Sequence, residues 1–290
     1  MMATAPRPAR AIFPRAQLRH ELAVREQRLL PVVRQALAGI RTLLTHQDLR
    51  IAAAMGQIPP IAPAIERRWA AYIDQMIAAL TGPMPIARAA PAPDPEEQRR
   101  RERLFISAQE LARRQIGALI RELSPAQLQA VRAQLAALME FGPRPDVLAA
   151  IGQATGLTTP QTESVANFYR QRVDQGIAPG PAVAATQNYA DRLLDLRART
   201  IARHEAVTYT NQLVLERAAA ATSAGGTIVK QWVSARDGRV DGGLPTGICR
   251  VLDDGSRIPV DQPFEYLGES FDAPPAHIGC RCLVEIWREE

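Results

Sequence analysis

The sequence predicts an α+β protein, mostly helical in its N-terminal and central regions and ending in a small β-rich C-terminal module. Two observations carry this prediction. Apolar residues recur at three-, four- and seven-residue spacing through much of the first 220 residues, as on one stripe of a helix. From Thr227 the residues become β-branched and aromatic, and short apolar pieces alternate with glycine-rich turns.

Composition sets outer limits on what the chain can be. It has 290 residues, is 47% hydrophobic and carries a net charge of +5, with Lys230 as its only lysine. This modest positive charge permits contact with nucleic acid without requiring it. No apolar run approaches the roughly 18 residues of a membrane span, and no apolar segment follows the basic N-terminus, so we expect no membrane segment and no secretory signal. Three cysteines clustered at one end indicate a reducing cytoplasm and no disulfide framework.

Residues 1–81 are predicted to be an extended arm followed by a helical region. The first helix starts near Gln17 and has an apolar stripe formed by Leu22, Leu29, Val33, Leu37, Ile40 and Leu44. Off this stripe lie Arg25, Arg28, Arg34 and Arg41, which we expect to form a solvated face; the alternative is a face that binds a partner or DNA. Prolines in residues 58–63 are expected to end this helix, and a second helix is predicted over residues 64–80.

Residues 82–95 are rich in proline and alanine and predict a semi-rigid linker, the best domain boundary in the chain. A helical domain over residues 96–222 is expected to follow. Its first helix carries an arginine cluster that could contact phosphate, Arg99, Arg100, Arg101 and Arg103, although a solvated helix face with Glu102 interleaved is equally consistent with the pattern. Ser124 and Pro125 predict a new helix start, and that helix should end near Phe141.

Further helices are predicted in the rest of this domain. One covers residues 146–153, and the next has Thr159 as its N-cap and Gly176 as its stop. A long helical run is expected over residues 182–222, with a break near its middle left open.

The β-rich module is predicted over residues 223–290. Residues 227–233 (TIVKQWV) have the composition of a strand, and residues 281–287 alternate Arg281 and Glu285, expected to point outward, with apolar neighbours.

The module also gathers the residues with the most distinctive chemistry. Cys249, His277, Cys280 and Cys282 offer three sulfurs and one imidazole, a ligand set for structural zinc with no open coordination position. Two alternatives stay open: reduced buried thiols with a hydrogen-bonded His277, and a disulfide from Cys249 to Cys280 or Cys282 in an oxidising medium. His204, Glu205, Asp237 and Asp241 could be assembled into an acid/base site, but nothing in their spacing requires it. We therefore predict no catalytic residues and no small-molecule substrate.

Several segments of the second half together resemble the phage head morphogenesis family of Mu F-like minor head proteins. The segments are ARTIARHEAVTYTNQ, KQWVSARDGRV and PPAHIGCRC, and the resemblance covers roughly residues 150–290. The matching positions are Arg199, Thr200, Arg203, Glu205, Asn211, Trp232, Asp237, Arg239, Pro274, Pro275, His277, Cys280, Arg281 and Cys282. The chain departs from the family pattern after the Asp-x-Arg turn, where many members have a Cys-x-x-Cys pair and this chain has Cys249 alone.

The resemblance implies a minor head protein of a phage or prophage-derived particle, which acts by binding and not as an enzyme. Its expected partners are the portal protein and the major capsid protein, with packaged DNA as a further candidate. Its expected locations are the host cytoplasm during assembly and the virion interior. The alternative is an enzyme or toxin-like effector, a nuclease or transferase, built on the C-terminal module. A third hypothesis, a plain DNA-binding protein, rests on the net charge alone.

Overall fold

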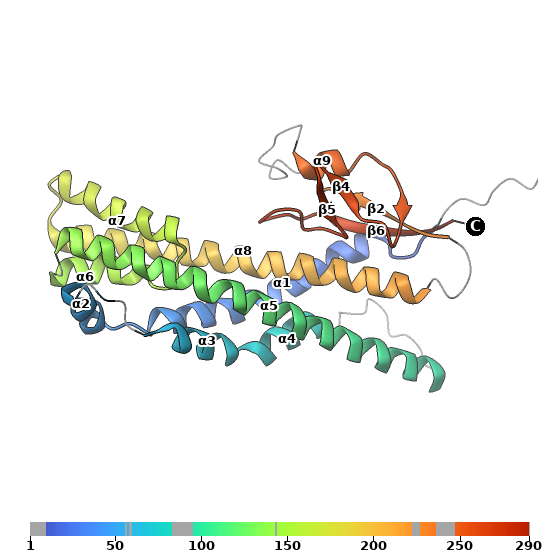
Figure 1. The fold of residues 1–290 in the computed structure, drawn as a ribbon, viewed down its shortest axis with the longest axis horizontal. Coiled ribbons are helices and arrows are strands. Elements are labelled where there is room, and N and C mark those ends of the chain that lie inside the picture. The colour runs from blue at the N-terminus through green and yellow to red at the C-terminus, as the bar shows by residue number, and fades with distance from the viewer. Residues whose placement is uncertain are drawn as a thin grey trace, which may run out of the picture. The chain divides into compact units, whose positions relative to one another are not determined.

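Helices make up most of the described chain, and short antiparallel strands gather near its C-terminus (Figure 1). The computed structural model describes residues 10–55, 57, 60–82, 95–142, 144–221, 227–235 and 247–289, without the side chains of residues 10, 95–105, 124, 220 and 221. The predicted α+β class is confirmed. The helices are α1 Arg15–Arg41, α2 His46–Met55, α3 Ala62–Ala70, α4 Ile73–Thr81, α5 Pro95–Phe141, α6 Pro145–Ile151, the 3-10 turn η1 Gly152–Ala154, α7 Thr159–Asp174, α8 Pro179–Ala221 and α9 Ile248–Leu252. The strands are β1 Arg10–Ala11, β2 Thr227–Val233, β3 Ile258–Pro259, β4 Phe264–Tyr266, β5 Glu269–Phe271 and β6 Leu283–Glu289.

The chain forms two compact units, each assembled from separate stretches. Unit 1 comprises Met1–Leu29, Ala79–Ala112 and Ala202–Glu290, and unit 2 comprises Leu30–Ala78 and Arg113–Ile201. Helices α1, α4, α5 and α8 each contribute residues to both units. Each unit thus combines stretches that lie far apart in the sequence, and most of the predicted linker 82–95 lies outside the described residues.

The prediction of one helix from Gln17 to the prolines at 58–63 is wrong, because α1 ends at Arg41 and α2 begins at His46. Thr45 and Asp48 start the second helix: the Thr45 N–H donates to Asp48 Oδ2 at 2.8 Å, and the Asp48 N–H donates to Thr45 Oγ1 at 3.1 Å. This reciprocal pair satisfies amide groups that lack partners in a first helical turn. The predicted helix 64–80 is likewise divided into α3 and α4.

The helix start predicted at Ser124 and Pro125 is also wrong, since α5 runs through both residues. Proline removes one backbone hydrogen bond and clashes with the preceding turn, at a cost of about 3 kcal/mol. The apolar stripe continues on both sides of Pro125, with Ile116 and Val131 buried. Burying each such side chain stabilises by about 1.5–3 kcal/mol, enough to keep the helix continuous across the proline.

Helices α7 and α8 are closer to prediction. The cap of α7 is Thr158 and not Thr159: its backbone N–H donates to Gln161 Oε1 at 3.2 Å. Gly176, with φ of +74°, follows this helix and provides the predicted stop. Helix α8 covers nearly all of the predicted run 182–222 and is continuous.

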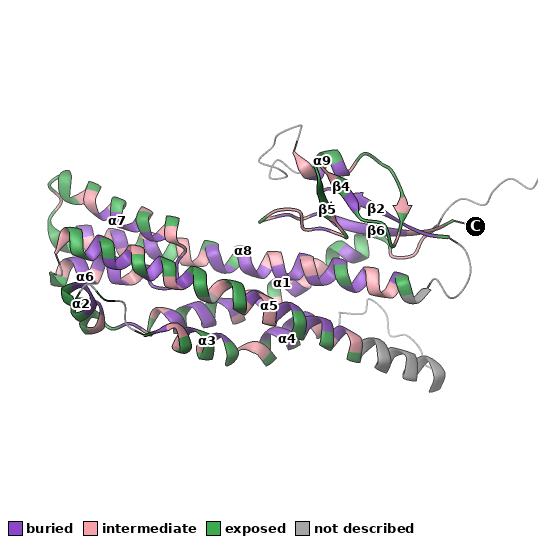
Figure 2. Cartoon of the chain, viewed as in Figure 1, coloured by how far each residue is buried: buried purple, intermediate pink, exposed green. Residues whose placement is uncertain are grey.

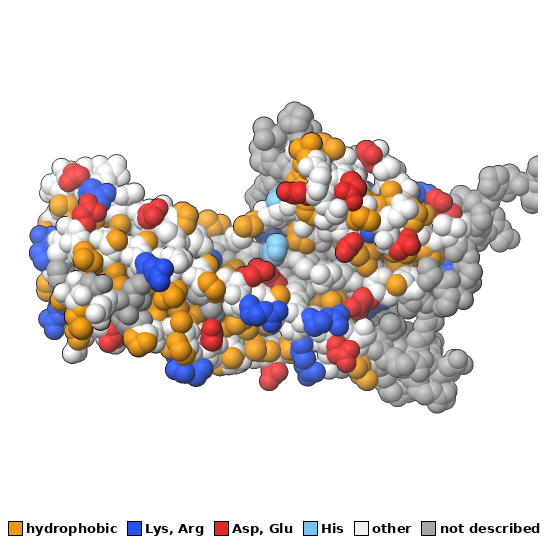
Figure 3. Space-filling view, viewed as in Figure 1, with side chains coloured by type: hydrophobic (Ala, Val, Ile, Leu, Met, Phe, Trp, Pro, Cys, Tyr) orange, Lys and Arg blue, Asp and Glu red, His pale blue; other side chains and the backbone are white. Residues whose placement is uncertain are grey.

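Unit 2 is helical, and the buried residues follow one side of each helix (Figure 2). Ion pairs join the second half of α1 to the first half of α8: Arg34 Nε lies 2.7 Å from Asp195 Oδ1, and Arg41 Nη1 lies 2.6 Å from Asp191 Oδ1. Basic and acidic side chains are interspersed on the face of the molecule seen in Figure 3. Arg34 and Arg41 thus have acidic partners, in keeping with a charged helix face.

Arg25 is not on a solvated face. It is only 4% exposed, and in unit 1 its Nη1 lies 3.0 Å from Glu21 Oε2 while its Nε donates to the Leu80 carbonyl at 3.1 Å. Desolvation lowers the pKa of this guanidinium, and Glu21 opposes that effect. The expectation of a solvated Arg25 is therefore wrong, because the side chain extends into a polar core formed by α1, α4 and α8.

The sheet of unit 1 is antiparallel, with strand order β1-β6-β2-β3, and β4 and β5 form a separate hairpin. Along the central pair, Thr227 lies opposite Glu289 and Val233 lies opposite Leu283. The N-terminal arm supplies the edge strand β1, and the Ile12 N–H donates to the Ile286 carbonyl at 2.9 Å. Arg10 and Ala11 thus complete a sheet whose other strands come from the far end of the sequence.

Candidate metal centre

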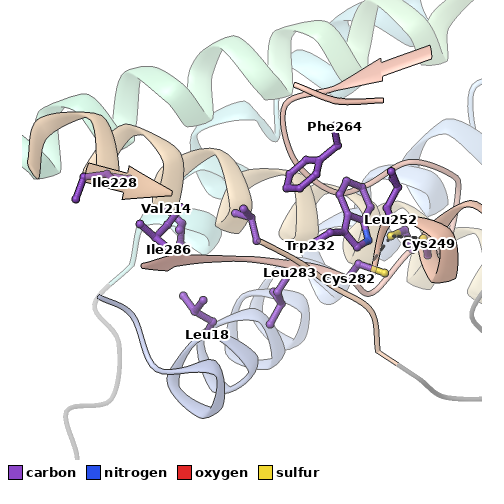
Figure 4. Packing of buried hydrophobic residues seen from close by; sticks show 13 residues of the cluster. Leu18, Val214, Ile228, Trp232, Cys249, Leu252, Phe264, Cys282, Leu283 and Ile286 are labelled. Atoms are coloured by element: carbon purple, nitrogen blue, oxygen red, sulfur yellow. Dashed lines mark hydrogen bonds between the residues drawn. The ribbon is translucent and has the colours of Figure 1, made fainter. Parts of the chain in front are cut away.

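Cys249 lies on the short helix α9, which starts after Gly247. Its side chain is fully buried in the hydrophobic core of the module, together with Cys280, Cys282 and Trp232. Figure 4 shows Trp232 between Phe264 and the cysteines. One ligand thus comes from a helix, whereas the others come from the loop before β6.

Cys280 is positioned by a tight turn that starts at His277. The Cys280 N–H donates to the His277 carbonyl at 3.2 Å, and Gly279 within the turn has a φ of +81°. A side chain at that φ is sterically disfavoured, so glycine fits this position. The loop leading into the turn contains a cis bond between Pro274 and Pro275.

The three thiols lie close enough together to bind a metal ion. Their Sγ atoms are all within 4.8 Å of one another, and those of Cys249 and Cys280 are 3.6 Å apart. A tetrahedral zinc with Zn–S bonds of about 2.3 Å places its sulfurs about 3.8 Å apart. The spacing of the thiols therefore fits a metal ion of this kind.

The charge of the cluster also suits a cation. Hydrogen bonds from the Cys249 and Cys282 thiols hold the pKa of Cys280 below its ordinary value. The hydrogen bond to Cys280 holds the pKa of Cys249 above its ordinary value, with burial acting in the same direction. The Cys282 N–H also approaches Cys280 Sγ at 3.5 Å. Cys280 is thus the thiol of the cluster whose pKa is lowered, and the thiolate is the form of cysteine that binds metals.

His277 lies beside the thiols as a candidate fourth ligand. Its Nε2 is 3.1 Å from Cys249 Sγ, and its Nδ1 is 2.9 Å from the Ile278 carbonyl. Because a carbonyl oxygen only accepts hydrogen bonds, Nδ1 carries the proton and the lone pair of Nε2 faces the cluster. A backbone carbonyl that fixes the tautomer in this way is typical of metal-binding histidines. All four predicted ligand residues are thus brought together, with three of them in the mutually close thiol group.

Asn211 of α8 holds the ligand-bearing loop in place. Its buried side-chain amide donates to the carbonyls of Pro274 and Cys282, both at 3.2 Å, and its Oδ1 accepts from the Val284 N–H at 2.8 Å. These contacts satisfy backbone groups on both sides of the cysteines. A side chain 63 residues earlier in the sequence than Pro274 therefore fixes the geometry of the loop.

Trp232 and Lys230 of β2 connect the core of the module to the β4–β5 hairpin. Trp232 is fully buried, and its ring meets those of Phe264 and Phe271 edge to face at 5.2 and 6.4 Å. Lys230 is 1% exposed; its Nζ donates to the Asp272 carbonyl at 2.8 Å and lies 5.1 Å from the Phe264 ring centroid. Burial lowers the pKa of this lysine. The only lysine of the chain is thus part of the core.

The remaining positions of the family motif are dispersed. Arg203 forms a bidentate pair with Glu26, its Nη2 lying 2.8 Å from Glu26 Oε1, and Glu205 is buried. In unit 2, Arg199 pairs with Asp195 of its own helix and Thr200 donates to the Leu196 carbonyl. Arg281, in the cysteine loop, and Pro275, earlier in the same loop, are both half-buried. Asp237 and Arg239 lie outside the described residues, as do the side chains of Arg99, Arg100, Arg101 and Arg103.

One prediction about the last strand is wrong. Glu285, expected to point outward, is 4% exposed and accepts two hydrogen bonds from Arg15, at 3.1 and 3.0 Å. The prediction from alternating polar and apolar residues assumed that one face of the sheet is solvated, but Arg15 at the start of α1 covers Glu285. The partner lies 270 residues away, and no local pattern in the sequence could have indicated it.

Comparison with models of known families, with curated proteins and with solved structures finds no match. Among the described residues, no helix combines the length and the apolar character needed to cross a membrane.

Proposed function

We propose that this chain is a minor head protein that acts by binding during assembly of a phage or prophage-derived particle. Its partners in this proposal are the portal protein and the major capsid protein. It would act in the host cytoplasm during assembly and could be retained in the virion interior.

The observation that carries the proposal is the contact of Asn211 with the cysteine loop. The family resemblance rests on short segments separated by tens of residues, and a chance resemblance gives no reason for these segments to meet. Here the amide of Asn211 bonds to Pro274, Cys282 and Val284, and Trp232 packs in the same core as Cys280 and Cys282. The motif positions Asn211, Trp232, Cys280 and Cys282, from α8, β2 and the final loop, thus lie in one structural unit, which supports treating them as one module.

We further propose that the module holds one structural zinc through Cys249, Cys280, Cys282 and His277. Thiolate and imidazole are the ligands that zinc prefers in structural sites, and four protein ligands leave no position open for substrate. Such an ion joins α9 to the loop before β6 and adds the free energy of metal binding to that of folding. In this proposal the metal makes the module rigid and takes no part in chemistry.

Contact with packaged DNA is a further part of the proposal. It is supported by the net charge of +5 and by the sequence cluster Arg99, Arg100, Arg101 and Arg103. Arginines that contact phosphate release counterions, so such binding weakens steeply as salt concentration rises.

Deleting the gene in cells that produce the particle, together with affinity purification of the tagged full chain, tests the proposal. We expect the chain to co-purify with the portal protein or the major capsid protein, and the deletion to lower the yield of filled heads. Complementation with the intact gene is the control. Unchanged head yield, together with absence of both proteins from the purified material, would overturn the proposal.

A further inference from the structure

The β4–β5 hairpin ends in a leucine that neither its conformation nor its environment explains. Leu267 is 88% exposed, the highest exposure of any large apolar side chain in the described part of the chain. It has a φ of +49°, and Gly268 after it has a φ of +87°. A two-residue hairpin turn with both φ values positive favours Asn-Gly, because bulky side chains are disfavoured there. Neither turn stability nor burial therefore accounts for leucine at this tip.

The base of this hairpin is fixed to the core of the module. Phe264 on β4 and Phe271 on β5 pack their rings against Trp232, and Phe264 is buried. Across the strands, the Ser270 hydroxyl donates to Glu265 Oε1 at 2.8 Å. The tip thus projects from an anchored base, so little conformational freedom would be lost when a partner binds.

The flanks of the tip are acidic. The segment from Asp261 to Asp272 has four carboxylates, counting these two aspartates, and no Lys or Arg. The chain as a whole carries a net charge of +5. Asp261 and Asp272 act on the buried Lys230, raising its pKa against the effect of burial. Glu265 and Glu269, on either side of Leu267, are both exposed, and within the described residues no ion pair joins either to a cation. Figure 3 shows acidic side chains spread over the C-terminal module on this face.

We propose that the β4–β5 hairpin is a docking finger, whose Leu267 inserts into an apolar pocket rimmed by Lys or Arg side chains on a partner protein. An apolar anchor in a pocket with charged groups around it is a common arrangement in protein interfaces. The paired carboxylates oppose approach to nucleic acid or to an anionic membrane, and they favour a basic protein surface. This inference rests on the proposed function, since it takes the portal protein or the major capsid protein as the partner.

Binding of the purified full chain to purified portal protein and to purified major capsid protein tests the finger. Leu267→Asn removes the apolar tip and installs a residue that the turn favours, so a fold defect cannot explain lost binding. Glu265→Gln combined with Glu269→Gln removes the flanking charges and keeps an acceptor for Ser270. Met139→Gln is the matched control, because Met139 is a 56% exposed apolar residue on a different element, α5.

We expect Leu267→Asn to raise the Kd for one of the two proteins by roughly tenfold or more, with an unchanged or higher unfolding midpoint. The double Gln variant should weaken binding and reduce its dependence on salt, and Met139→Gln should bind like the unaltered chain.

If the chain binds and Leu267→Asn binds equally well, the docking finger is overturned while the proposed function stands. If the unaltered chain binds neither protein, both proposals fail. If Leu267→Asn instead abolishes self-association seen by mass photometry, the tip contacts a second copy and the proposed partner is wrong.

Discussion

The C-terminal module and the helical unit 2 are stabilised by different kinds of contact. In the module, single polar groups connect distant segments: Asn211 bonds to the cysteine loop, and Lys230 donates to the backbone of Asp272. Unit 2 also has a buried amide of this kind, Gln134, which donates to the carbonyls of Ile151 and Gly152. Elsewhere in unit 2, the cluster that includes Ala154, Val165 and Ala190 is apolar, and the ion pairs of α1 with α8 lie at the surface.

This difference indicates where the two regions tolerate change. Where the free energy of unfolding comes from many similar apolar contacts, substituting one polar residue at the surface removes little of it. A core that depends on a buried amide or carboxylate concentrates its free energy, because removing one partner leaves another buried polar group unsatisfied. We therefore expect substitutions of the buried polar groups of the module to lower stability more than substitutions of the surface pairs and helix caps of unit 2.

The largest effect of this kind is expected for Asn211→Ala. The substitution leaves the Val284 N–H without its acceptor and the carbonyls of Pro274 and Cys282 without their donor, all in a buried setting. Since each unsatisfied buried group costs about 1–3 kcal/mol, we expect a loss of about 3 kcal/mol or more. Urea unfolding followed by the fluorescence of buried Trp232 measures it. Gln212→Ala, at the next and exposed position of α8, is the control, and an equal loss for both variants would remove the role assigned to Asn211.

A smaller effect is expected for Arg15→Ala, which removes the partner of the buried Glu285 carboxylate. Arg15 itself is partly exposed, so water can replace some of its hydrogen bonds, and we expect a loss of about 1–3 kcal/mol. Amide hydrogen exchange of Ile12, which bonds to Ile286, should quicken as β1 loosens. The nearby exposed Arg19→Ala should leave both measurements unchanged, and unaltered exchange at Ile12 in Arg15→Ala would contradict the link between the pair and the arm.

The smallest effect is expected in unit 2, for Asp48→Ala. Hydrogen bonds from Thr45 lower the pKa of Asp48 below its ordinary value of 3.8. Because the pKa is lower in the folded state, this carboxylate stabilises α2 above about pH 3.8, and the contribution is lost as pH falls through the lower, folded-state pKa. At neutral pH we expect a cost of about 1 kcal/mol or less, since the cap lies at the surface. Thermal melts of the unaltered chain and of Asp48→Ala at pH 7 and pH 2.5 check this. If the difference between their melting temperatures is the same at both pH values, the carboxylate is not its cause.

The sequence was sufficient for features that depend on local pattern. The α+β class, the long helix α8 and the strand β2 all follow from the spacing and type of neighbouring residues. The grouping of Cys249, His277, Cys280 and Cys282 followed from the preference of zinc for such ligands. Predictions from local pattern were wrong where a partner distant in the sequence determines whether a side chain is buried. Glu285 is buried by Arg15, and Arg25 is buried by Glu21 and the backbone of Leu80.

The prediction of a helix start at Pro125 was wrong for a related reason. A proline usually ends a helix, but its local cost was smaller than the free energy of burying the apolar residues on both sides, which depends on tertiary packing. The roles of Asn211 and Lys230 were equally hidden, because their backbone acceptors carry no signature in the sequence.

The zinc content of the purified full chain tests most directly whether the module is stabilised by a metal. Protein prepared without chelator should contain about one zinc per chain by elemental analysis, and Cys282→Ser should lower that value and the unfolding midpoint together. A zinc content well below one per chain, with the fold intact in chelator, would contradict the account and leave the three thiols as a reduced, buried part of the core.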